Sequence, residues 1–436
     1  MMRSTSSLDS GDSANPVYPF DPGPGAAPFA EHSSSPMPAS ARLIVRMLQK
    51  LSVGSLTVRF PDGHSARFGQ GAPHAEVVLS NWNVCDAALK RGDIGFGETY
   101  IAGDWNTPDL LALMNVMVAN RNAIEAVIYG SWWGRVLYRL RHLLRRNTRT
   151  GSKKNIHAHY DIGNDFYKLW LDDSMTYSSA LFGDARDATD ACARTDFEAL
   201  PLAQVAKYHR IIDELGVAPG ARILEIGCGW GGFAEAAAKR DLAVTGLTLS
   251  NEQLVLAEER IRTQQLDDRV TLKLCDYRDI EGSYDGIASI EMFEAVGETY
   301  WANYFECIKR LLKPGGRAAI QTITIAEHLF ADYRRSSDFI QQYIFPGGML
   351  PAPSAFRRAA QAAGLRIVDE HAFGQDYART LGAWFVRFVD HERAVRDGGY
   401  DTAFIRTWSF YLAYCAAAFR YRNTDVVQFT LEHETS

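Results

Sequence analysis

Residues 225–232 read Glu-Ile-Gly-Cys-Gly-Trp-Gly-Gly and directly follow a short apolar segment, residues 221–224. This pattern predicts a β-strand that ends on the carboxylate of Glu225 and then turns at Gly227, Gly229 and Gly231. Glycine lets the chain reverse tightly and lets a ligand approach the backbone closely. The pattern predicts a nucleotide-like ligand whose cationic or hydroxyl group meets the carboxylate, although such a turn also occurs in α/β proteins without a nucleotide site.

The next predicted strand, residues 243–247, narrows the choice of ligand. A dinucleotide site places an acidic residue about 20 positions after the glycines, where it binds a ribose. Here the strand continues into Thr248-Leu249-Ser250, which contains no acid. The sequence therefore argues against NAD. The E-x-G-x-G-x-G form instead resembles motif I of S-adenosylmethionine-dependent methyltransferases, and this resemblance implies S-adenosyl-L-methionine as the cofactor.

Further cofactor contacts are expected after the second and third strands. Ser250 and Gln253 form an S-x-x-Q capping box, which predicts the start of a helix. Because the carboxyl end of the second strand meets the ligand ribose in this fold, Thr248, Ser250 and Gln253 are candidate contacts as well. Asp276 ends the third strand and is either an adenine contact or a turn residue. The predicted set is completed by Tyr177 and Ser178.

Composition limits the classes of protein that the chain can belong to. Its 436 residues are 47% hydrophobic with a net charge of −6, which predicts a sizeable core and no nucleic-acid partner. Six scattered cysteines without a C-x-x-C pair fit a reduced, cytosolic protein. No secretory signal is recognised at the amino end. The apolar run Trp408–Phe419 is about half the length that a bilayer crossing needs, so it predicts a buried helix.

The pattern changes along the chain in four steps. Residues 1–40 are dominated by Ser, Pro, Gly and Asp and predict a disordered tail. Residues 41–125 predict a small α+β domain, with strands at 55–60 and 75–79, turns at 61–63 and 92–93, and a helix over 109–119. Residues 155–436 alternate strands and helices. The strands begin near Ile223, Val244, Val270, Gly286 and Ala318, and residues 313–316 predict a turn before the last of them.

Residues 126–154 form a basic linker between these domains. Apolar residues such as Trp133, Leu137 and Leu140 recur at helical spacing, and arginines such as Arg135 and Arg139 recur on other faces. This pattern is typical of an amphipathic helix that lies on an anionic membrane. It is equally compatible with a helix that packs one domain on the other and exposes its arginines.

Eight long motifs, in one order from about Asn155 to the carboxyl end, give a specific resemblance. They are HYDIGNDFY, MTYSSALF, LEIGCGWGGF, TLSNEQ, SIEMFEAVG, QYIFPGGMLP, FGQDYARTLGAW and YCAAAFR. Together they resemble the cyclopropane-fatty-acyl-phospholipid synthase family, which includes the mycolic acid cyclopropane synthases. The resemblance implies an α/β, Rossmann-like class I methyltransferase domain with a mainly parallel seven-stranded sheet. Residues 41–120 resemble, more weakly, the smaller amino-terminal domain of the bacterial members.

The resemblance also implies an activity: transfer of the methyl group of S-adenosyl-L-methionine to the cis double bond of an unsaturated acyl chain in a membrane phospholipid. Attack of an alkene on the methyl group leaves a carbocation, so the site must be dry and must surround the cation with aromatic faces or anions. Tyr160, Tyr177, Phe182 and Tyr377 are the candidate aromatic wall.

Members of this family hold a bicarbonate as the base, with a Cys, a Glu, a His, a Tyr and a backbone group. Mapped by motif, these positions are Ser179 in place of Cys, Glu294, Gln321 in place of His, Tyr377 and the backbone of Ile323. Ser and Gln donate hydrogen bonds but do not titrate near neutrality as His does. Whether bicarbonate is retained therefore stays open, as does the choice between a cyclopropane ring and a methyl- or methylene-branched chain. We expect Glu294 to hold the anion or take the proton itself, with Tyr377 orienting it.

Two other functions stay open: a small-molecule N-methyltransferase and a non-catalytic lipid-binding protein. The intact glycine loop argues against the second. His157 and His159 lack a third ligand at metal-binding spacing, so no metal site is expected. We further expect a cytoplasmic enzyme, peripherally associated with the inner face of the membrane. The oligomeric state stays open, with a homodimer as one expectation.

Overall fold

The computed structural model describes residues 37–128, 162–183 and 193–433. Helix α1 (Ala39–Leu48) begins two residues inside the range predicted as a tail. The predicted basic linker, residues 126–154, lies almost entirely outside the described residues, because α4 (Arg121–Ile128) is the last element before the gap. Tyr160, His157 and His159 lie outside them as well.

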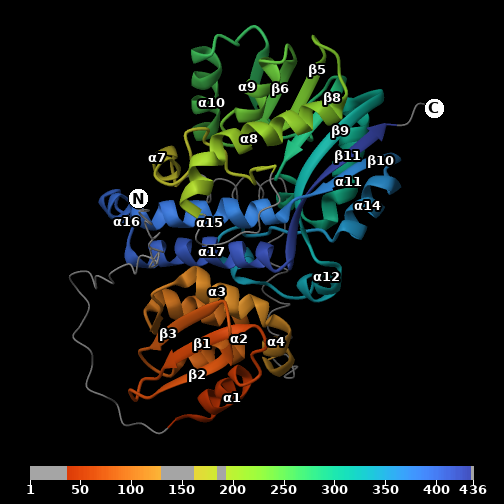
Figure 1. Cartoon of the computed structure of the whole chain (residues 1–436). Helices are drawn as coiled ribbons and strands as arrows, with labels where there is room; N and C mark the ends of the chain where they lie inside the picture. The colour runs from red at the N-terminus through yellow and green to blue at the C-terminus, as the bar shows by residue number, and fades with distance from the viewer. Residues whose placement is uncertain (1–36, 129–161, 184–192, 434–436) are drawn as a thin grey trace, which may run out of the picture.

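The amino-terminal domain is a four-stranded sheet covered by helices (Figure 1). Its strand order is β2 (Ser65–Gln70), β1 (Gly54–Arg59), β3 (His74–Leu79) and β4 (Trp105–Asn106). Both predicted strands and the predicted helix are present, the latter as α3 (Leu110–Ala119). Strand β2 was not predicted, because it has a single buried side chain, Phe68, and therefore carries little hydrophobic signal.

The two turns predicted in this domain have different outcomes. The turn at 61–63 is confirmed and joins β1 to β2. The turn at Gly92-Asp93 is wrong, because helix α2 (Asn83–Ala102) runs through it. Gly92 instead kinks α2, with φ +58° and ψ −133°, a backbone conformation that favours glycine. The pattern therefore located a break in the helix but not its end.

The larger sheet has seven strands, as expected. Its order is β10 (Leu365–Ala372), β11 (Thr424–His433), β9 (Leu312–Ile325), β8 (Tyr284–Ile290), β5 (Arg222–Ile226), β6 (Ala243–Thr248) and β7 (Val270–Leu274). Strands β9-β8-β5-β6-β7 are parallel, and β11 is antiparallel to both β9 and β10. The turn predicted at 313–316 lies inside β9, where the pairing with β8 jumps from Tyr284–Leu312 to Gly286–Arg317.

Helices cover both faces of this sheet because alternate strand residues are buried on opposite sides. Ile223 of β5 packs with α8 (Ala193–Leu215), α9 (Gly232–Ala238) and α10 (Asn251–Thr263). Its neighbour Leu224 packs on the other side with α11 (Trp301–Leu311) and α14 (Pro353–Ala362). This is the three-layer arrangement of an α/β domain.

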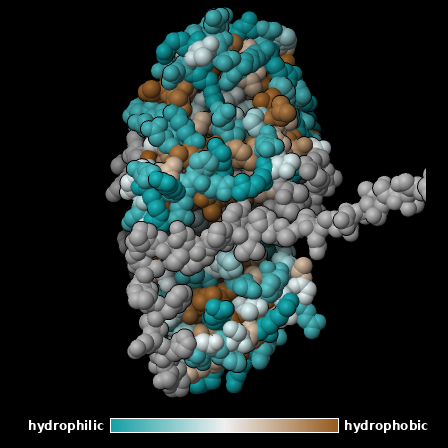
Figure 2. Space-filling view, turned by 60° about the vertical axis from the view of Figure 1, so that its left-hand side comes forward, coloured by the Kyte–Doolittle hydropathy of each residue, from teal (hydrophilic) through white to brown (hydrophobic). Residues whose placement is uncertain are grey.

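A helical layer joins the two domains (Figure 1). Helix α17 (Thr402–Arg420) packs against α15 (Gly374–Asp390) on one side and against α3 and α2 on the other. The apolar run Trp408–Phe419 forms most of α17 and is largely buried, which confirms that prediction. Among the described helices, none combines the length and apolarity that a bilayer crossing requires. Hydrophilic residues predominate on the face drawn in Figure 2.

The described residues also form several short helices. They are α7 (Asn164–Lys168), η2 (Phe293–Ala295), η3 (Glu298–Tyr300), α12 (Glu327–Tyr333), α13 (Phe339–Tyr343) and α16 (Glu392–Asp397). Of these, α13 contacts both α2 and α17, so it links the small domain to the helical layer.

Candidate functional site

A cavity of about 190 Å³ lies at the carboxyl ends of β5, β6 and β8. In a parallel sheet with helices on both faces, this is the edge at which ligands bind. Eight of the ten predicted cofactor contacts line the cavity: Tyr177, Ser178, Glu225, Gly227, Gly229, Thr248, Gln253 and Asp276. The other two, Gly231 and Ser250, do not.

The glycine loop turns beneath this cavity. Gly229 has φ +50°, and a Cβ added there would point into open space, with no other atom within 4 Å. Since Gly229 lines the cavity, that space is available to a ligand. Gly231 has a different role, because it precedes α9 and a Cβ there would meet Ala257 Cβ at 3.2 Å. Gly231 therefore serves helix packing.

Ser250 serves helix α10. Its Oγ accepts a hydrogen bond from Gln253 N at 3.3 Å, so it is the expected N-cap. The predicted capping box is only half formed, because Gln253 Oε1 accepts from Thr248 Oγ1 at 2.9 Å. The side chains of Thr248 and Gln253 thus hold each other at the wall of the cavity.

Among the residues that line this cavity, Glu225 gives the clearest indication of a bound ligand. Its side chain is buried at the cavity wall, and its Oε2 atom has no hydrogen-bond partner. Burial raises the pKa of Glu225 to about 8, against the attraction of the Lys207 ammonium. Because buried polar atoms normally have partners, this oxygen fits a hydroxyl or ammonium donor of S-adenosyl-L-methionine.

Asp276 also lines the cavity, but its carboxylate already accepts hydrogen bonds from Arg278. Arg278 donates from Nε to Asp276 Oδ1 at 2.8 Å and from Nη2 to Oδ2 at 2.5 Å. An adenine amino group would therefore share a carboxylate oxygen with Arg278. The expected adenine contact stays a prediction.

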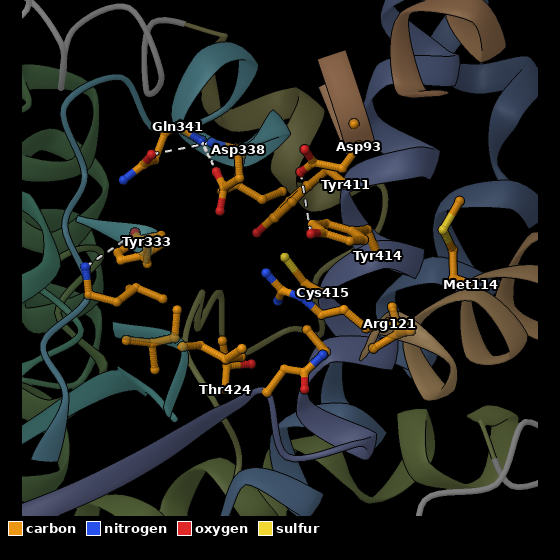
Figure 3. Close-up of a pocket in the computed structure, with 18 of the residues that line it drawn as sticks. Asp93, Met114, Arg121, Tyr333, Asp338, Gln341, Tyr411, Tyr414, Cys415 and Thr424 are labelled. Carbon is orange, nitrogen blue, oxygen red and sulfur yellow. Dashed lines mark hydrogen bonds between the residues drawn. The ribbon is translucent and has the colours of Figure 1, made fainter. Parts of the chain in front are cut away.

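A second and larger cavity, of about 910 Å³, extends from the first toward the amino-terminal domain (Figure 3). The small domain supplies one wall with apolar side chains of α1 and α3, namely Ile44, Met47, Leu48, Met114, Met117 and Val118. Three residues line both cavities: Tyr177, Glu291 and Ala295. The two cavities therefore adjoin at these residues.

A polar cluster interrupts the apolar wall where the domains meet (Figure 3). Asp93, next to the kink of α2, accepts hydrogen bonds from Phe339 N at 3.0 Å and from Tyr414 Oη at 3.3 Å. Asp338 caps helix α13, receiving a hydrogen bond from Gln341 N at 2.8 Å. Burial, followed by the nearby charge of Asp93, raises the pKa of Asp338 to about 7.

This raised pKa predicts a pH-dependent stability. Between the ordinary pKa of Asp338 and about 7, the unfolded chain ionises there while the folded protein keeps the proton. The stabilising contribution is therefore complete at acid pH and is lost as the pH rises toward 7. Asp338→Asn keeps an oxygen for the cap but cannot ionise, so its melting temperature should fall less than the parent's between about pH 4.5 and about pH 7.5. Thermal unfolding across this range measures the difference. Parallel curves for parent and variant would contradict the assignment.

The five residues mapped to the bicarbonate site do lie together, but not as expected. Glu294 Oε1 accepts hydrogen bonds from Ile323 N and from Thr322 Oγ1, the latter at 3.0 Å. Tyr377 does not orient Glu294; its hydroxyl donates to Glu291 Oε2 at 2.7 Å. That prediction is wrong. Burial, followed by the charge of Glu291, raises the pKa of Glu294 to about 8, so Glu294 is mainly protonated at neutral pH.

Glu291 was not predicted from the sequence. It directly follows β8, is partly buried, and its carboxylate accepts hydrogen bonds from three donors. Besides Tyr377, Ser179 N and Gln321 Nε2 donate to its Oε1, each at 2.8 Å. The hydroxyl of Ser179 turns away and donates to Ala180 O, so only its backbone faces the site. A signal existed, since an acid just after a parallel strand lies at the ligand-binding edge.

Lys207 of α8 was not predicted either. Its ammonium is buried and donates to Ser178 Oγ and Gln204 Oε1, both at 2.6 Å. Burial lowers the pKa of Lys207 to about 7, opposed by the charges of Glu291, Asp172 and Glu225. No sequence signal marks it, because a lysine inside a helix normally faces solvent.

The aromatic wall is partly as predicted. Tyr177 and Tyr377 line the larger cavity, and the Tyr177 hydroxyl lies 2.7 Å from that of Tyr411, which lines it as well. Phe182 lines neither cavity; its ring lies under the Arg379 guanidinium at 3.8 Å. The assignment of Phe182 to the wall is therefore not supported.

The sheet order, the glycine loop and the unpartnered Oε2 atom of Glu225 at the strand ends define an S-adenosylmethionine-dependent methyltransferase. The family model for mycolic acid cyclopropane synthetase matches residues 147–429, and the chain belongs to this family. It is 37% identical over 406 residues to tuberculostearic acid methyltransferase UfaA1 of Mycobacterium tuberculosis, covering 92% of this chain and 93% of that protein. It is 35% identical over 370 residues to cyclopropane-fatty-acyl-phospholipid synthase of Escherichia coli K12, covering 82% of this chain and 88% of that protein.

Solved structures agree with this class. The cyclopropane synthase MmaA2 of Mycobacterium tuberculosis superposes with a TM-score of 0.57 at 29% identity, covering 64% of this chain and 98% of that chain. Mycolic acid cyclopropane synthase CmaA1, complexed with SAH and CTAB, gives the same values. Both are thus matched almost completely by about two thirds of this chain.

Proposed function

We propose that this enzyme transfers the methyl group of S-adenosyl-L-methionine to the cis double bond of an unsaturated acyl chain in a membrane phospholipid. One observation carries the proposal: a large, mainly apolar cavity adjoins the cofactor cavity at Tyr177, Glu291 and Ala295. Its volume of about 910 Å³ is at the upper end of the range for small-molecule sites, which suits a long acyl chain. The names of the relatives, a fatty acid methyltransferase and cyclopropane synthases, point the same way.

The chain's residues have separate roles in this reaction. When bound, S-adenosyl-L-methionine supplies an electrophilic methyl group on a sulfonium. The alkene π electrons form the new carbon–carbon bond as the carbon–sulfur bond breaks, which leaves a positive charge on the acyl chain. The rings of Tyr177, Tyr377 and Tyr411 and the Glu291 carboxylate at the junction stabilise that charge in a mainly apolar site.

The product depends on whether a hydride shift precedes the loss of the proton. Loss of a proton from the added methyl group lets the freed electron pair close a cyclopropane ring. If a hydride first shifts from the methylated carbon to the cationic carbon, the charge moves to the methylated carbon, and loss of a proton from the added methyl group then gives a methylene branch. A saturated methyl branch needs a further hydride donor. Both outcomes belong to the proposed function.

The amino-terminal domain is part of the proposed substrate site. Its helices α1 and α3 close the far side of the apolar cavity, and Arg121 of α4 lies beside the polar cluster. The solved relatives of the family match only about two thirds of this chain. We therefore assign to this domain a role in accommodating the acyl chain.

Lipid analysis tests the function. Lipids from cells that express the chain, compared with cells that carry an empty vector, should contain acyl chains heavier by one CH₂. In NMR spectra, cyclopropyl proton signals indicate the ring, whereas olefinic signals indicate a methylene branch. An unchanged lipid profile together with methylation of a small amine by the purified enzyme would favour an N-methyltransferase. Cofactor binding without any methylated product would favour a lipid-binding protein.

We also propose that the enzyme is cytoplasmic and associates peripherally with anionic membranes through residues 126–149. Each basic residue near such a surface contributes about 1 kcal/mol, screened by salt. Replacing Arg135, Arg139, Arg145 and Arg146 with Gln should therefore sharply reduce sedimentation with anionic liposomes at low salt. Cofactor affinity, measured on the same variant, should stay unchanged. Equal sedimentation of variant and parent would remove this role from the linker.

A further inference from the structure

Glu291 has an unusual backbone for an acidic residue. Its φ is +50°, in the left-handed region that non-glycine residues seldom adopt, and its backbone N donates to Gln321 O at 2.8 Å. Such strain persists only where the surroundings enforce it, and it concentrates at functional sites. Here it occurs at the end of β8, where the side chain lines both the cofactor cavity and the apolar cavity.

The donors around Glu291 are themselves fixed. Arg210 Nη1 donates to Gln428 Oε1 at 2.8 Å, and Gln428 Nε2 donates to Gln321 Oε1 at 3.0 Å. This chain of hydrogen bonds leaves the Gln321 amide with its Nε2 facing Glu291. A glutamine held in this way is a permanent donor at neutral pH, which is what a carboxylate requires.

A separate bicarbonate does not fit this arrangement. Of the five residues mapped to its site, Ser179 N, Gln321 and Tyr377 bind the Glu291 carboxylate, while Ile323 N binds Glu294. An added anion would thus have to compete with the Glu291 carboxylate for these donors. The negative charges of Glu291 and of an added bicarbonate would repel each other strongly in this mainly apolar surrounding.

We propose that Glu291 is the built-in base of this enzyme and takes the place that the family resemblance assigns to bicarbonate. This inference rests on the proposed function. Glu291 Oε2 accepts only the Tyr377 hydroxyl among the described contacts, so the oxygen keeps a lone pair for a substrate proton. Burial raises the pKa of Glu291, while the Tyr377 hydrogen bond and the Lys207 charge favour its ionised form.

The proposed step is a proton transfer from the acyl chain to Glu291. Glu291 Oε2 forms an O–H bond with a proton from the cationic acyl chain, and the electrons of the broken C–H bond neutralise the cation. They do so as a ring bond when the proton leaves directly, or as a double bond when a hydride shift has first moved the charge to the methylated carbon. Glu291 becomes a neutral carboxylic acid and returns the proton to solvent before the next turnover.

Two variants test the base by its chemistry. Glu291→Ala should lower turnover by about 10²–10⁴, the usual range for a positioned base. It also frees three donors, so bicarbonate added to carbonate-depleted buffer should restore activity with a saturable dependence. Glu291→Gln should be as slow but not rescued, because its amide still fills the space. The parent enzyme should be indifferent to bicarbonate.

Binding of ¹³C-labelled bicarbonate, followed by NMR line broadening, gives a readout that needs no lipid substrate. Broadening is expected with Glu291→Ala and not with the parent or Glu291→Gln. The inference is overturned if the parent binds bicarbonate and loses turnover on its depletion, or if Glu291→Gln keeps near-parental turnover. If Glu291→Ala does not fold, turnover and bicarbonate binding of the parent and of the isosteric Glu291→Gln variant still test the inference. An inactive parent refutes the proposed function, whereas the NMR result still tests the position of Glu291.

Discussion

Gly229→Val is expected to weaken the binding of S-adenosyl-L-methionine about 5–150-fold, toward the upper end of that range. Gly229 lines the cofactor cavity, and a side chain added there would enter space that no protein atom occupies. Filling a ligand's space by one branched side chain costs about 1–3 kcal/mol. Calorimetric titration with S-adenosylhomocysteine measures the loss directly.

Gly220→Val is the matched control. Gly220 has φ +82° and likewise no atom within 4 Å of an added Cβ, so both variants carry the cost of a valine at positive φ. Gly220 lies before the amino end of β5, whereas Gly229 lies beyond its carboxyl end, where the cavity is. Both variants should lose stability, but only Gly229→Val should lose affinity. Parental affinity in Gly229→Val would refute the placement of the cofactor.

The parts of the fold that were predicted correctly depend on short-range patterns. Strand β5 is covered on both faces, so its neighbouring residues Ile223 and Leu224 are both apolar. An apolar run followed by glycines can be recognised from a few adjacent residues. The same holds for α17, whose apolar run matched neither a membrane span nor a strand. Local sequence therefore predicted the five parallel strands and the glycine turn after β5, whereas the seven-stranded sheet followed from the family resemblance, and no strand was predicted at β10 or β11.

The arrangement of the two acids could not be predicted in this way. Glu291 and Glu294 are three residues apart in one motif, and residue type does not separate them. The distinction comes from Ser179, Gln321 and Tyr377, which approach Glu291 from three distant segments. It comes also from the positive φ of Glu291, which an acidic residue in a sequence does not reveal. Tertiary contacts therefore determine which of the two acids accepts the hydrogen bond from Tyr377.

The contribution of the amino-terminal domain to the apolar cavity could not be predicted from the sequence for a similar reason. Met47 and Met114 are ordinary apolar positions on helices, and nothing local shows that they face a cavity rather than a core. The kink at Gly92 brings Asp93 to the backbone of α13 in the other domain, so a predicted turn proved to be a domain contact. Such features depend on how domains pack, which the pattern of one segment does not contain.

A buried ion pair between Arg379 and Asp196 is expected to contribute strongly to the stability of the folded protein. Arg379 donates to both Asp196 oxygens, at 2.8 Å and 3.2 Å, and each side chain is only 1% exposed. On the same helix, Asp376 Oδ2 accepts from Phe182 N at 2.9 Å and Thr380 Oγ1 accepts from Ala180 N at 3.2 Å. Helix α15 therefore fastens the segment whose Ser179 N–H binds Glu291.

Arg379→Met should lower the free energy of unfolding by about 3–5 kcal/mol, because it removes the positive charge that lies against the buried Asp196 carboxylate. Removing both charges, as in Arg379→Met with Asp196→Leu, should recover much of this loss, since apolar pairs can replace buried ion pairs. Arg194→Met is the control: its pair with Asp390 has 60% and 30% exposed side chains and should contribute about 0–1 kcal/mol. Urea unfolding followed by tryptophan fluorescence ranks the three variants. If Arg379→Met unfolds at the same urea concentration as Arg194→Met, the buried pair does not hold this segment, and the position of Ser179 must depend on other contacts of α15.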